Sequence, residues 1–345
     1  MARELLPALA LICLGFGPPA LTSLDPFGSS LDLDSLNSLT AVAPRLPVEA
    51  RASIVVDDLS GHPLASSRAD ERLAQASLTK LMTALVALDR ADLGTTVSAT
   101  ERSFSEPTVI GLDPGDALPL EDMLYGLLLP SGNDAALAIA ETLGGGSIER
   151  FVGWMNDRAA AMGLRNTHFA NPTGLDAAGH YSSARDLAET ARAITAEPTL
   201  ARIVATPRYV VPGPPPYLFV NSNPLMGSYE GLDGVKTGFT DNAGRTFAAS
   251  ATRNGQRLIV VVLNSPDIRR EAASLLELGF GMQRVTLGVW HPGFSRVTIQ
   301  SGNGDRWTRL GGWEVPLLRA FTIQGGAPPQ VFASVLGQSV ARWVP

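Results

Sequence analysis

The apolar and polar positions of the chain define a central helical region with strand-like segments on both sides. Helices are predicted where apolar residues and good helix formers recur between capping residues and glycines. The predicted helices cover Leu78–Leu88, Leu120–Leu129, Asp134–Leu143, Ser147–Met162, Ser182–Thr195 and Ile268–Met282. The Ser183-x-x-Asp186 spacing at the start of the fifth helix resembles a capping box.

Short β-branched apolar runs predict strands before and after these helices. The predicted strands cover Ala52–Asp58, Arg208–Val211, Leu218–Val220, Thr246–Thr252 and Leu258–Leu263. Asn254-Gly255, between the last two strands, is typical of a tight hairpin turn. Helices in the middle of the chain with strands on both sides favour an α+β domain with one antiparallel sheet.

The pattern changes near both ends of the chain. From residue 285 onward, short strand candidates stand among Gly and Pro, so residues 285–345 are predicted to form a small β-rich module after a main domain of residues 48–284. Residues 23–47 are rich in Ser, Leu and Asp without a clear period, which is typical of a linker.

The first residues resemble a secretory signal. Arg3 precedes the apolar stretch Leu5–Gly17, and Pro18-Pro19 then breaks any helix. We expect a signal peptide over residues 1–22, with an uncleaved membrane anchor as the alternative. Cleavage would remove Cys13, the only Cys of the chain, and leave a mature extracytoplasmic protein without thiols.

Composition and charge exclude several classes of protein. A chain with 45% hydrophobic and 17% charged residues can bury a globular core. The net charge of −6 argues against a nucleic-acid-binding surface, and no apolar run reaches the roughly 18 residues of a membrane-spanning helix. One Cys excludes a thiolate zinc cluster, and none of the four His stands in an HExxH motif. We therefore expect no metal or other cofactor.

The two Lys residues among 27 basic residues both lie in motifs that can carry chemistry. In Ser77-Leu78-Thr79-Lys80, the three-residue spacing at a helix start places Ser77 and Lys80 on one helix face. A Ser hydroxyl needs a neighbouring base to become a good nucleophile, and a neutral, buried Lys can be that base. The alternative is a capped helix with a solvated Lys, but the apolar neighbours Leu81 and Leu85 favour burial.

Lys236 lies in Gly234-Val235-Lys236-Thr237-Gly238. A strand with this sequence offers a cation and a hydroxyl side by side to a ligand carboxylate, and Gly238 lacks a Cβ where a substrate would approach the strand edge. The alternative is an edge-strand Lys followed by a turn. Val235 replaces the Gly that a phosphate loop needs before its Lys.

A third motif lies between these two. Pro130 ends one predicted helix and Asn133-Asp134 opens the next, so the intervening turn presents Ser131 and Asn133 from a fixed position. By itself, Ser-Gly-Asn is typical of an ordinary loop.

In the order SxxK, SxN, KTG, the three motifs resemble those of the penicillin-recognising serine acyltransferases. Their surroundings, LLLPSGNDAA, NTHFANPTGLD, HYSSARDLA and GLDGVKTGFT, resemble the low-molecular-mass D-alanyl-D-alanine carboxypeptidases over about Val48 to Gln283. The resemblance implies the transpeptidase fold of penicillin-binding proteins and β-lactamases, an antiparallel sheet with a helical cluster.

The resemblance implies a catalytic role for three residues, one of which acts together with the substrate-binding residue Lys236. Ser77 would be the acylated nucleophile and Lys80 the base that activates it. Ser131 would relay a proton to the leaving amine, assisted by Lys236.

The resemblance also implies substrate-binding roles. Asn133 would hold the substrate amide, and Thr237, next to Gly238, would bind the terminal carboxylate. The backbone N–H groups of Ser77 and Phe239 would form an oxyanion hole. Arg270, or the adjacent Arg269, would occupy the position of a supporting Arg.

The implied reaction removes the terminal D-Ala from peptidoglycan stem peptides ending in D-Ala-D-Ala, with β-lactams as covalent inhibitors. A cross-link endopeptidase stays open because the motifs do not separate it from a carboxypeptidase. A class A β-lactamase is disfavoured, since no Glu-x-x-Leu-Asn stands between Asn133 and Lys236, and intact motifs disfavour an inactive binding module. Val331–Pro345 lacks a cationic face opposite an apolar one, which disfavours membrane attachment through the C-terminus, and membrane association by other means stays open.

Overall fold

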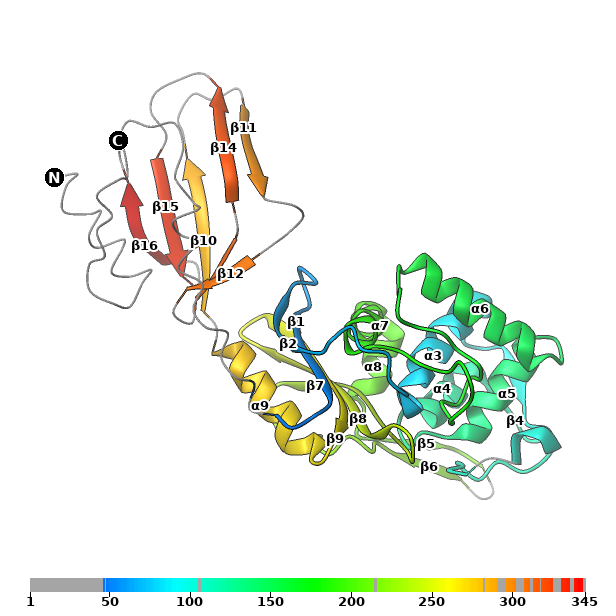
Figure 1. The fold of residues 1–345 in the computed structure, drawn as a ribbon. Helices are drawn as coiled ribbons and strands as arrows, with labels where there is room; N and C mark the ends of the chain where they lie inside the picture. Colours follow the sequence, from blue (N-terminus) through cyan, green and yellow to red (C-terminus); the bar gives the residue numbers. More distant parts are fainter. Residues whose placement is uncertain are drawn as a thin grey trace. The chain divides into compact units, whose positions relative to one another are not determined.

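The structure, a computed structural model, describes residues 46, 48–104, 107–213, 216–281 and 283–290, together with the backbone of six further strands up to residue 343. The chain divides into two compact units, of which one comprises Leu46–Gly279 and the other includes the C-terminal part from Phe280 (Figure 1). The predicted signal peptide and all of the predicted linker except Leu46 lie outside the described residues.

A five-stranded antiparallel sheet forms the base of the Leu46–Gly279 unit, with the strand order β2-β1-β9-β8-β7. Its strands are β1 (Ala52–Asp57), β2 (Pro63–Ser67), β7 (Leu232–Thr240), β8 (Gly244–Arg253) and β9 (Gln256–Ser265). Two small hairpins stand apart from this sheet: β3 (Thr96–Ser98) with β4 (Ala117–Pro119), and β5 (Arg208–Val211) with β6 (Tyr217–Val220).

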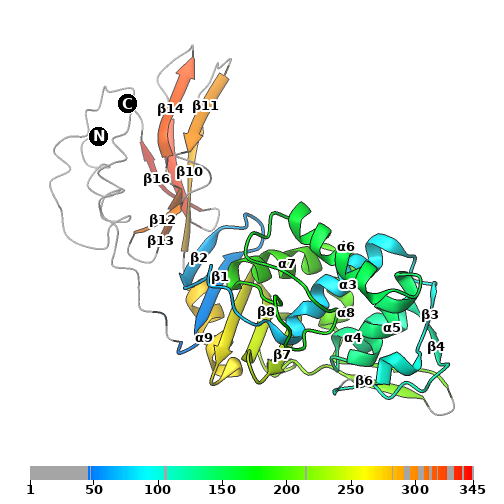
Figure 2. The same ribbon diagram turned by 45° about the vertical axis from the view of Figure 1, so that its right-hand side comes forward.

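Helices cover both faces of the five-stranded sheet (Figures 1 and 2). The helix α9 (Ile268–Phe280) packs on one face, and a helical cluster lies on the other. The cluster contains α3 (Thr79–Arg90), α4 (Leu120–Leu128), α5 (Asn133–Leu143), α6 (Ile148–Ala161), α7 (Ala184–Ala196), α8 (Pro198–Ala205) and the 3₁₀ turns η1 (Ala76–Leu78) and η2 (Glu101–Phe104). The predicted α+β fold with one antiparallel sheet is confirmed.

Local sequence signals explain where several elements begin and end. The hydroxyls of Ser147 and Ser183 accept hydrogen bonds from the third residue beyond them and cap α6 and α7. Asn254 and Gly255 both adopt positive φ, 50° and 77°, in the turn between β8 and β9. The predicted cap at Ser183 and the predicted hairpin are therefore confirmed.

Four elements, β2, α8, β3 and β4, lack a strong sequence signal and were not predicted. β2 is an edge strand that begins with Pro63, at a position where the missing backbone N–H is tolerated. α8 spans only eight residues and is capped by Glu197, which is not among the preferred capping residues. The β3–β4 pair has three residues in each strand.

Helix α3 lies at the centre of the helical cluster. Every residue from Thr79 to Ala87 is buried, which is the pattern of a helix surrounded by protein on all sides. Figure 2 shows α3 between the sheet and the outer helices. Because protein surrounds α3 on all sides, packing fixes the position of this helix and of any side chain that it directs toward the sheet.

The C-terminal unit is built from strands. One sheet has the order β12-β13-β10-β15-β16 and another pairs β11 with β14. The bounds are β10 (Gln283–Trp290), β11 (Arg296–Ser301), β12 (Trp307–Leu310), β13 (Trp313–Pro316), β14 (Leu318–Gln324), β15 (Gln330–Val335) and β16 (Gln338–Trp343).

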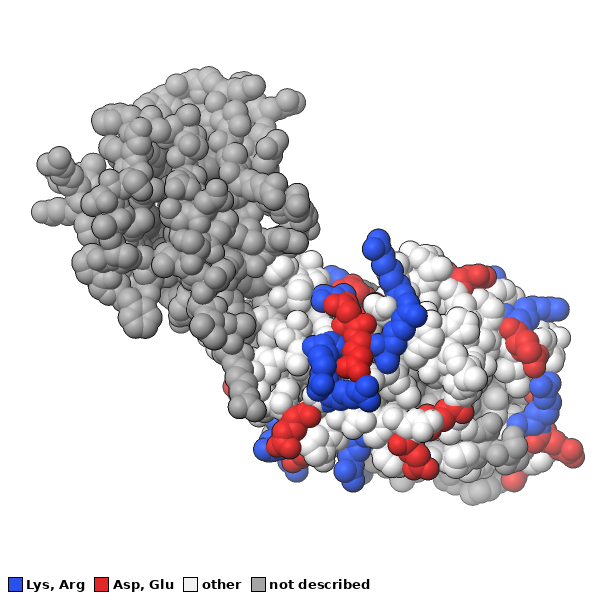
Figure 3. All heavy atoms as spheres, in the orientation of Figure 1, with Lys and Arg blue, Asp and Glu red and all other residues white. Residues whose placement is uncertain are grey.

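Charged side chains are mixed on the described surface. On the face shown in Figure 3, Arg side chains stand among Asp and Glu instead of gathering into a patch of one sign. Of the helices that the structure describes, none is both long and apolar enough to span a bilayer. Within the same residues, no group of three His, Cys, Asp or Glu could hold a metal ion.

Candidate active site

The SxxK motif spans the junction of η1 and α3. Ala76, directly before Ser77, has a φ of 49°, a left-handed conformation that is uncommon for a residue with a side chain. Ser77 is partly exposed, whereas Lys80 in the first turn of α3 is fully buried. The local fold thus presents a hydroxyl at the surface above an amine in the interior.

The Lys80 amine connects three segments of the chain. Its Nζ lies 2.9 Å from Ser77 Oγ, 2.6 Å from Asn133 Oδ1 and 2.6 Å from the backbone oxygen of Thr173. The second and third contacts are oxygens that can only accept hydrogen bonds. A neutral amine that donates its two N–H groups to them directs its lone pair toward Ser77 Oγ, which is the geometry of a general base.

The SxN motif forms the turn between α4 and α5. Ser131 is buried and has a φ of 76°, so it lies in the left-handed region, as Ala76 does. Asn133, the first residue of α5, donates from its backbone N–H to Thr108 O and from Nδ2 to Pro107 O. The amide of Asn133 is therefore held from one side by the segment at residues 107–108 and from the other by Lys80.

Asp134 fixes the segment that holds Asn133. This carboxylate is fully buried and accepts hydrogen bonds from the backbone N–H groups of Ile110, Gly111, Leu112 and Ala135, at 2.9 to 3.4 Å. Backbone N–H groups that converge on a carboxylate stabilise its charge without a cationic partner. In the sequence, Asp134 is recognisable only as the start of a helix, and this anchoring role is visible only in the structure.

Replacing Asp134 with Asn is expected to lower the free energy of unfolding by about 2–3 kcal/mol, because charge-assisted hydrogen bonds are lost and an amide N–H then faces backbone donors. Urea denaturation of the two proteins measures this difference. The exposed Asp92 gives a matched control, since Asp92→Asn should stay within about 0.5 kcal/mol of the wild type. Equal losses in both variants would contradict the anchoring role.

The backbone oxygen of Thr173 is a site atom that the sequence analysis did not identify. Asn171 Oδ1 accepts hydrogen bonds from Thr173 N, Thr173 Oγ1 and Gly174 N, an Asx turn that aims the Thr173 carbonyl at Lys80. Gly174 has a φ of 93°, and a Cβ there would lie 2.0 Å from Ala76 O. The signal was the Asn-Pro-Thr-Gly string, which predicts a turn but does not reveal what the turn faces.

Strand β7 carries the KTG motif along the edge of the sheet next to η1. A Cβ on Gly238 would lie 2.8 Å from the backbone nitrogen of Ser77, so Gly at this position allows β7 to lie against the nucleophile. Thr237 Oγ1 is 2.9 Å from Ser222 Oγ, and Lys236 Nζ donates to Thr237 O. The SxxK and KTG motifs, which are separated by about half of the chain, therefore meet at Ser77.

Lys236 is almost fully buried, with 1% of its surface exposed. Burial lowers the pKa of Lys236 to about 7, because the interior disfavours the charged form. Near neutral pH, this amine can therefore gain or lose a proton in response to a ligand.

Phe239 and Arg270, the two remaining predicted binding residues, lie in different parts of the fold. Phe239 follows Gly238 on β7 and is 64% exposed. Arg270 lies on α9, where its guanidinium pairs with Glu49 and Asp267, and the adjacent Arg269 contacts Ser228. These contacts include none of the motif residues, so a supporting role for Arg270 stays a prediction.

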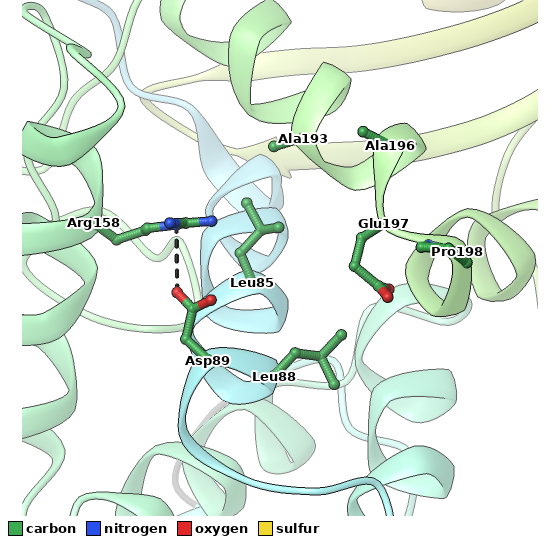
Figure 4. Close-up of a pocket in the computed structure, with 8 residues that line it drawn as sticks. All are labelled: Leu85, Leu88, Asp89, Arg158, Ala193, Ala196, Glu197 and Pro198. Atoms are coloured by element: carbon green, nitrogen blue, oxygen red, sulfur yellow. Dashed lines mark ion pairs between the residues drawn. The ribbon is translucent and has the colours of Figure 1, made fainter.

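A hollow of about 380 Å³ opens elsewhere on the helical cluster. It is lined by Leu85, Leu88, Asp89, Arg158, Ala193, Ala196, Glu197 and Pro198 (Figure 4). Arg158 and Asp89 form an ion pair of 3.4 Å across it, and α3 contributes its later turns instead of the turn with Lys80. No motif residue lines this hollow, so we place the chemistry at Ser77.

Several known proteins are similar to this chain in sequence and in fold. A family model described as D-alanyl-D-alanine carboxypeptidase matches residues 38–267. The D-alanyl-D-alanine carboxypeptidase DacB2 of Mycobacterium tuberculosis is 38% identical over 243 residues, which are 68% of this chain and 83% of the relative. DacF of Bacillus subtilis is 36% identical over 238 residues, and the match spans 67% of this chain but only 61% of that relative.

Solved structures agree with the sequence matches. The crystal structure of a D-alanyl-D-alanine carboxypeptidase from Mycobacterium tuberculosis has 37% identity and a TM-score of 0.66, and the match covers 70% of this chain and 95% of that one. The Streptomyces K15 DD-transpeptidase has 31% identity and a TM-score of 0.65, with 70% and 99% covered. The predicted transpeptidase fold is confirmed.

Proposed function

Because the chain belongs to the D-alanyl-D-alanine carboxypeptidase family, we propose that it removes the terminal D-Ala from peptidoglycan stem peptides through an acyl-Ser77 intermediate. The observation that carries this proposal is the contact set of Lys80 Nζ, which joins Ser77 Oγ to Asn133 Oδ1 and Thr173 O. A buried amine held in this way beside a hydroxyl is equipped for acyl transfer.

In the acylation step, Ser77 Oγ attacks the carbonyl carbon of the penultimate D-Ala, and Lys80 Nζ takes the hydroxyl proton. The C–N bond then breaks, and D-Ala leaves as an amine after it receives a proton through Ser131, assisted by Lys236. Water later hydrolyses the Ser77 ester and restores the hydroxyl. Splitting the reaction at a covalent ester replaces one difficult step by two easier ones.

Substrate binding is assigned to both sides of Ser77. Thr237 and protonated Lys236 hold the terminal carboxylate, and Asn133 holds the substrate amide. The backbone N–H groups of Ser77 and Phe239 stabilise the tetrahedral oxyanion, a role supported by the close approach of Gly238 to Ser77 N. β-Lactams enter the same site and stay on Ser77 as an ester.

The proposed substrate also implies the compartment in which the protein acts. Stem peptides lie outside the cytoplasm, so the proposal includes an extracytoplasmic, secreted or periplasmic protein whose signal peptide covers residues 1–22. The apolar segment Leu5–Gly17 supports this part of the proposal.

Incubation with benzylpenicillin is expected to give one covalent adduct on the wild-type protein and none on Ser77→Ala, since only the hydroxyl can form the ester. Intact-mass spectrometry measures both. A wild-type protein without an adduct, or an adduct that survives Ser77→Ala, would show that the mechanism is wrong.

A second assay measures the substrate preference. D-Ala release from a stem pentapeptide is compared with cleavage of a cross-linked dimer, with Ser77→Ala as the blank in both reactions. A carboxypeptidase releases D-Ala faster from the pentapeptide, whereas faster cleavage of the dimer would contradict the proposed substrate.

A further inference from the structure

The loop from Ala170 to His180 docks on α3 and delivers the Thr173 carbonyl to Lys80. The loop is closed at its base, where His168 and Tyr181 exchange backbone hydrogen bonds. Two of its contacts with α3 are accepted by backbone oxygens of the loop: Thr83 Oγ1 donates to Pro172 O at 2.7 Å, and Lys80 donates to Thr173 O at 2.6 Å.

His180 supplies a further contact, because its ring bonds both to the loop and to helix α3. Its Nδ1 accepts a hydrogen bond of 3.0 Å from the backbone N–H of Ala170, at the opposite end of the loop. Its Nε2 lies 2.8 Å from Thr79 Oγ1 in the first turn of α3. The ring is 7% exposed, so it connects the two ends of the loop with the helix inside the protein.

These contacts determine the tautomer of the ring. A backbone N–H can only donate, so Nδ1 of His180 carries no proton and the neutral ring carries its proton on Nε2. Nε2–H then donates to Thr79 Oγ1, and the side-chain amide of Gln75 lies 3.1 Å from the same Nε2. Burial lowers the pKa of His180 to about 4, which keeps the ring neutral at ordinary pH and preserves both bonds.

Thr79 extends the connection to the sheet. Gln75 Nε2 donates to Thr79 Oγ1 at 2.9 Å, and the backbone oxygen of Gln75 accepts a hydrogen bond from Thr246 Oγ1 on β8. Gln75 also precedes the left-handed Ala76 and the nucleophile. His180 therefore bonds to the residues that set the position of both Ser77 and Lys80.

We propose that His180 is a positioning residue, which holds the Ala170–His180 loop on α3 and thereby keeps the Thr173 oxygen on Lys80 Nζ. Without that acceptor, the amine turns and its lone pair leaves Ser77 Oγ. This inference rests on the proposed function, because its effect is measured through acylation of Ser77.

The bond of His180 to Ala170 and its bond to Thr79 can be removed separately. His180→Asn places an amide oxygen near the position of Nδ1 and keeps the acceptor for Ala170, whereas His180→Gln places an amide N–H near the position of Nε2 and keeps the donor for Thr79. Stopped-flow measurement with a fluorescent penicillin separates the acylation rate constant from the dissociation constant of the preceding complex.

His180→Ala is expected to lower the acylation rate constant about 10- to 100-fold, as for a misplacement of about 1 Å, while the dissociation constant changes less than threefold. The Asn and Gln variants should each lie between Ala and the wild type. Adding Thr79→Val should remove the partial rescue by Gln, so that His180→Gln with Thr79→Val acylates no faster than His180→Ala with Thr79→Val.

Two controls separate positioning from general loss of stability. Ser147→Ala removes the cap of α6, and Thr190→Val removes a buried hydroxyl that bonds within α7. Both should lower the melting temperature without slowing acylation. A His180→Ala protein that acylates at the wild-type rate, or a rate loss equal to that of the controls, would overturn the inference. Failure of the proposed function itself would appear differently, as a wild-type protein that forms no adduct.

Discussion

Replacing Lys80 with Arg should lower the rate constant for acylation of Ser77 by about 10²- to 10⁴-fold, although the positive charge is kept. The guanidinium stays protonated and offers no lone pair, so it cannot take the proton of Ser77. It also has to fit a site where the native side chain is fully buried and where Nζ already contacts three oxygens within 2.9 Å. Stopped-flow acylation by benzylpenicillin measures the change.

Two further variants separate the loss of the base from the added volume of Arg. Lys80→Met has nearly the volume of Lys and no amine, so it should be as inactive as Lys80→Arg. The third variant is Lys80→Cys, made in a background in which Cys13→Ser removes the only native Cys. Aminoethylation of the new Cys restores an amine and should recover part of the acylation rate. Rapid acylation of Lys80→Met would show that Lys80 is not the base.

The second large effect concerns Lys236 and pH. Since the pKa of Lys236 is about 7, the free enzyme holds this amine charged below pH 7 and increasingly neutral above it. If the charged form binds the terminal carboxylate, kcat/KM for the stem pentapeptide should fall by about tenfold for each pH unit above 7, because kcat/KM reports ionisations of the free enzyme. Steady-state kinetics across pH 6 to 10 tests this.

Lys236→Met provides the comparison. This variant keeps the volume of the side chain without a titratable group, so its kcat/KM should be low at every pH and lack the decline above pH 7. An unchanged decline in Lys236→Met would assign the titration to another group, and an undiminished kcat/KM below pH 7 would remove Lys236 from carboxylate binding.

Much of the fold followed from local pattern. Helices with strong apolar periodicity, such as Leu120–Leu128, begin and end within two residues of the prediction. β2 and α8 were missed because their stability comes from packing: Leu64 of β2 and Ile203 of α8 are buried by parts of the chain far away in sequence. A pattern within one segment does not contain that information.

The site was predictable where chemistry requires a particular side chain. Ser77, Lys80 and Asn133 came from motif spacing, and the structure joins them through one amine. Thr173 contributes only its backbone oxygen, an atom that every residue has, so its identity carries no signal. Asp134 and His180 act through backbone N–H groups whose positions depend on the tertiary fold.

The burial of Lys236 has a consequence for protein engineering. Among the residues that the structure describes, no carboxylate pairs with this side chain, which is 1% exposed. Its pKa of about 7 in the folded protein lies below the 10.5 of a free Lys, so the contribution of Lys236 to stability is largest above pH 10.5, declines as the pH falls from 10.5 to 7, and stays at its lowest value below pH 7. At the pH of most cells, the site therefore opposes folding. Selection of random variants for heat resistance alone should therefore enrich apolar replacements at this position. The selected variants would be more stable than the wild type but would have lost the proposed carboxypeptidase activity.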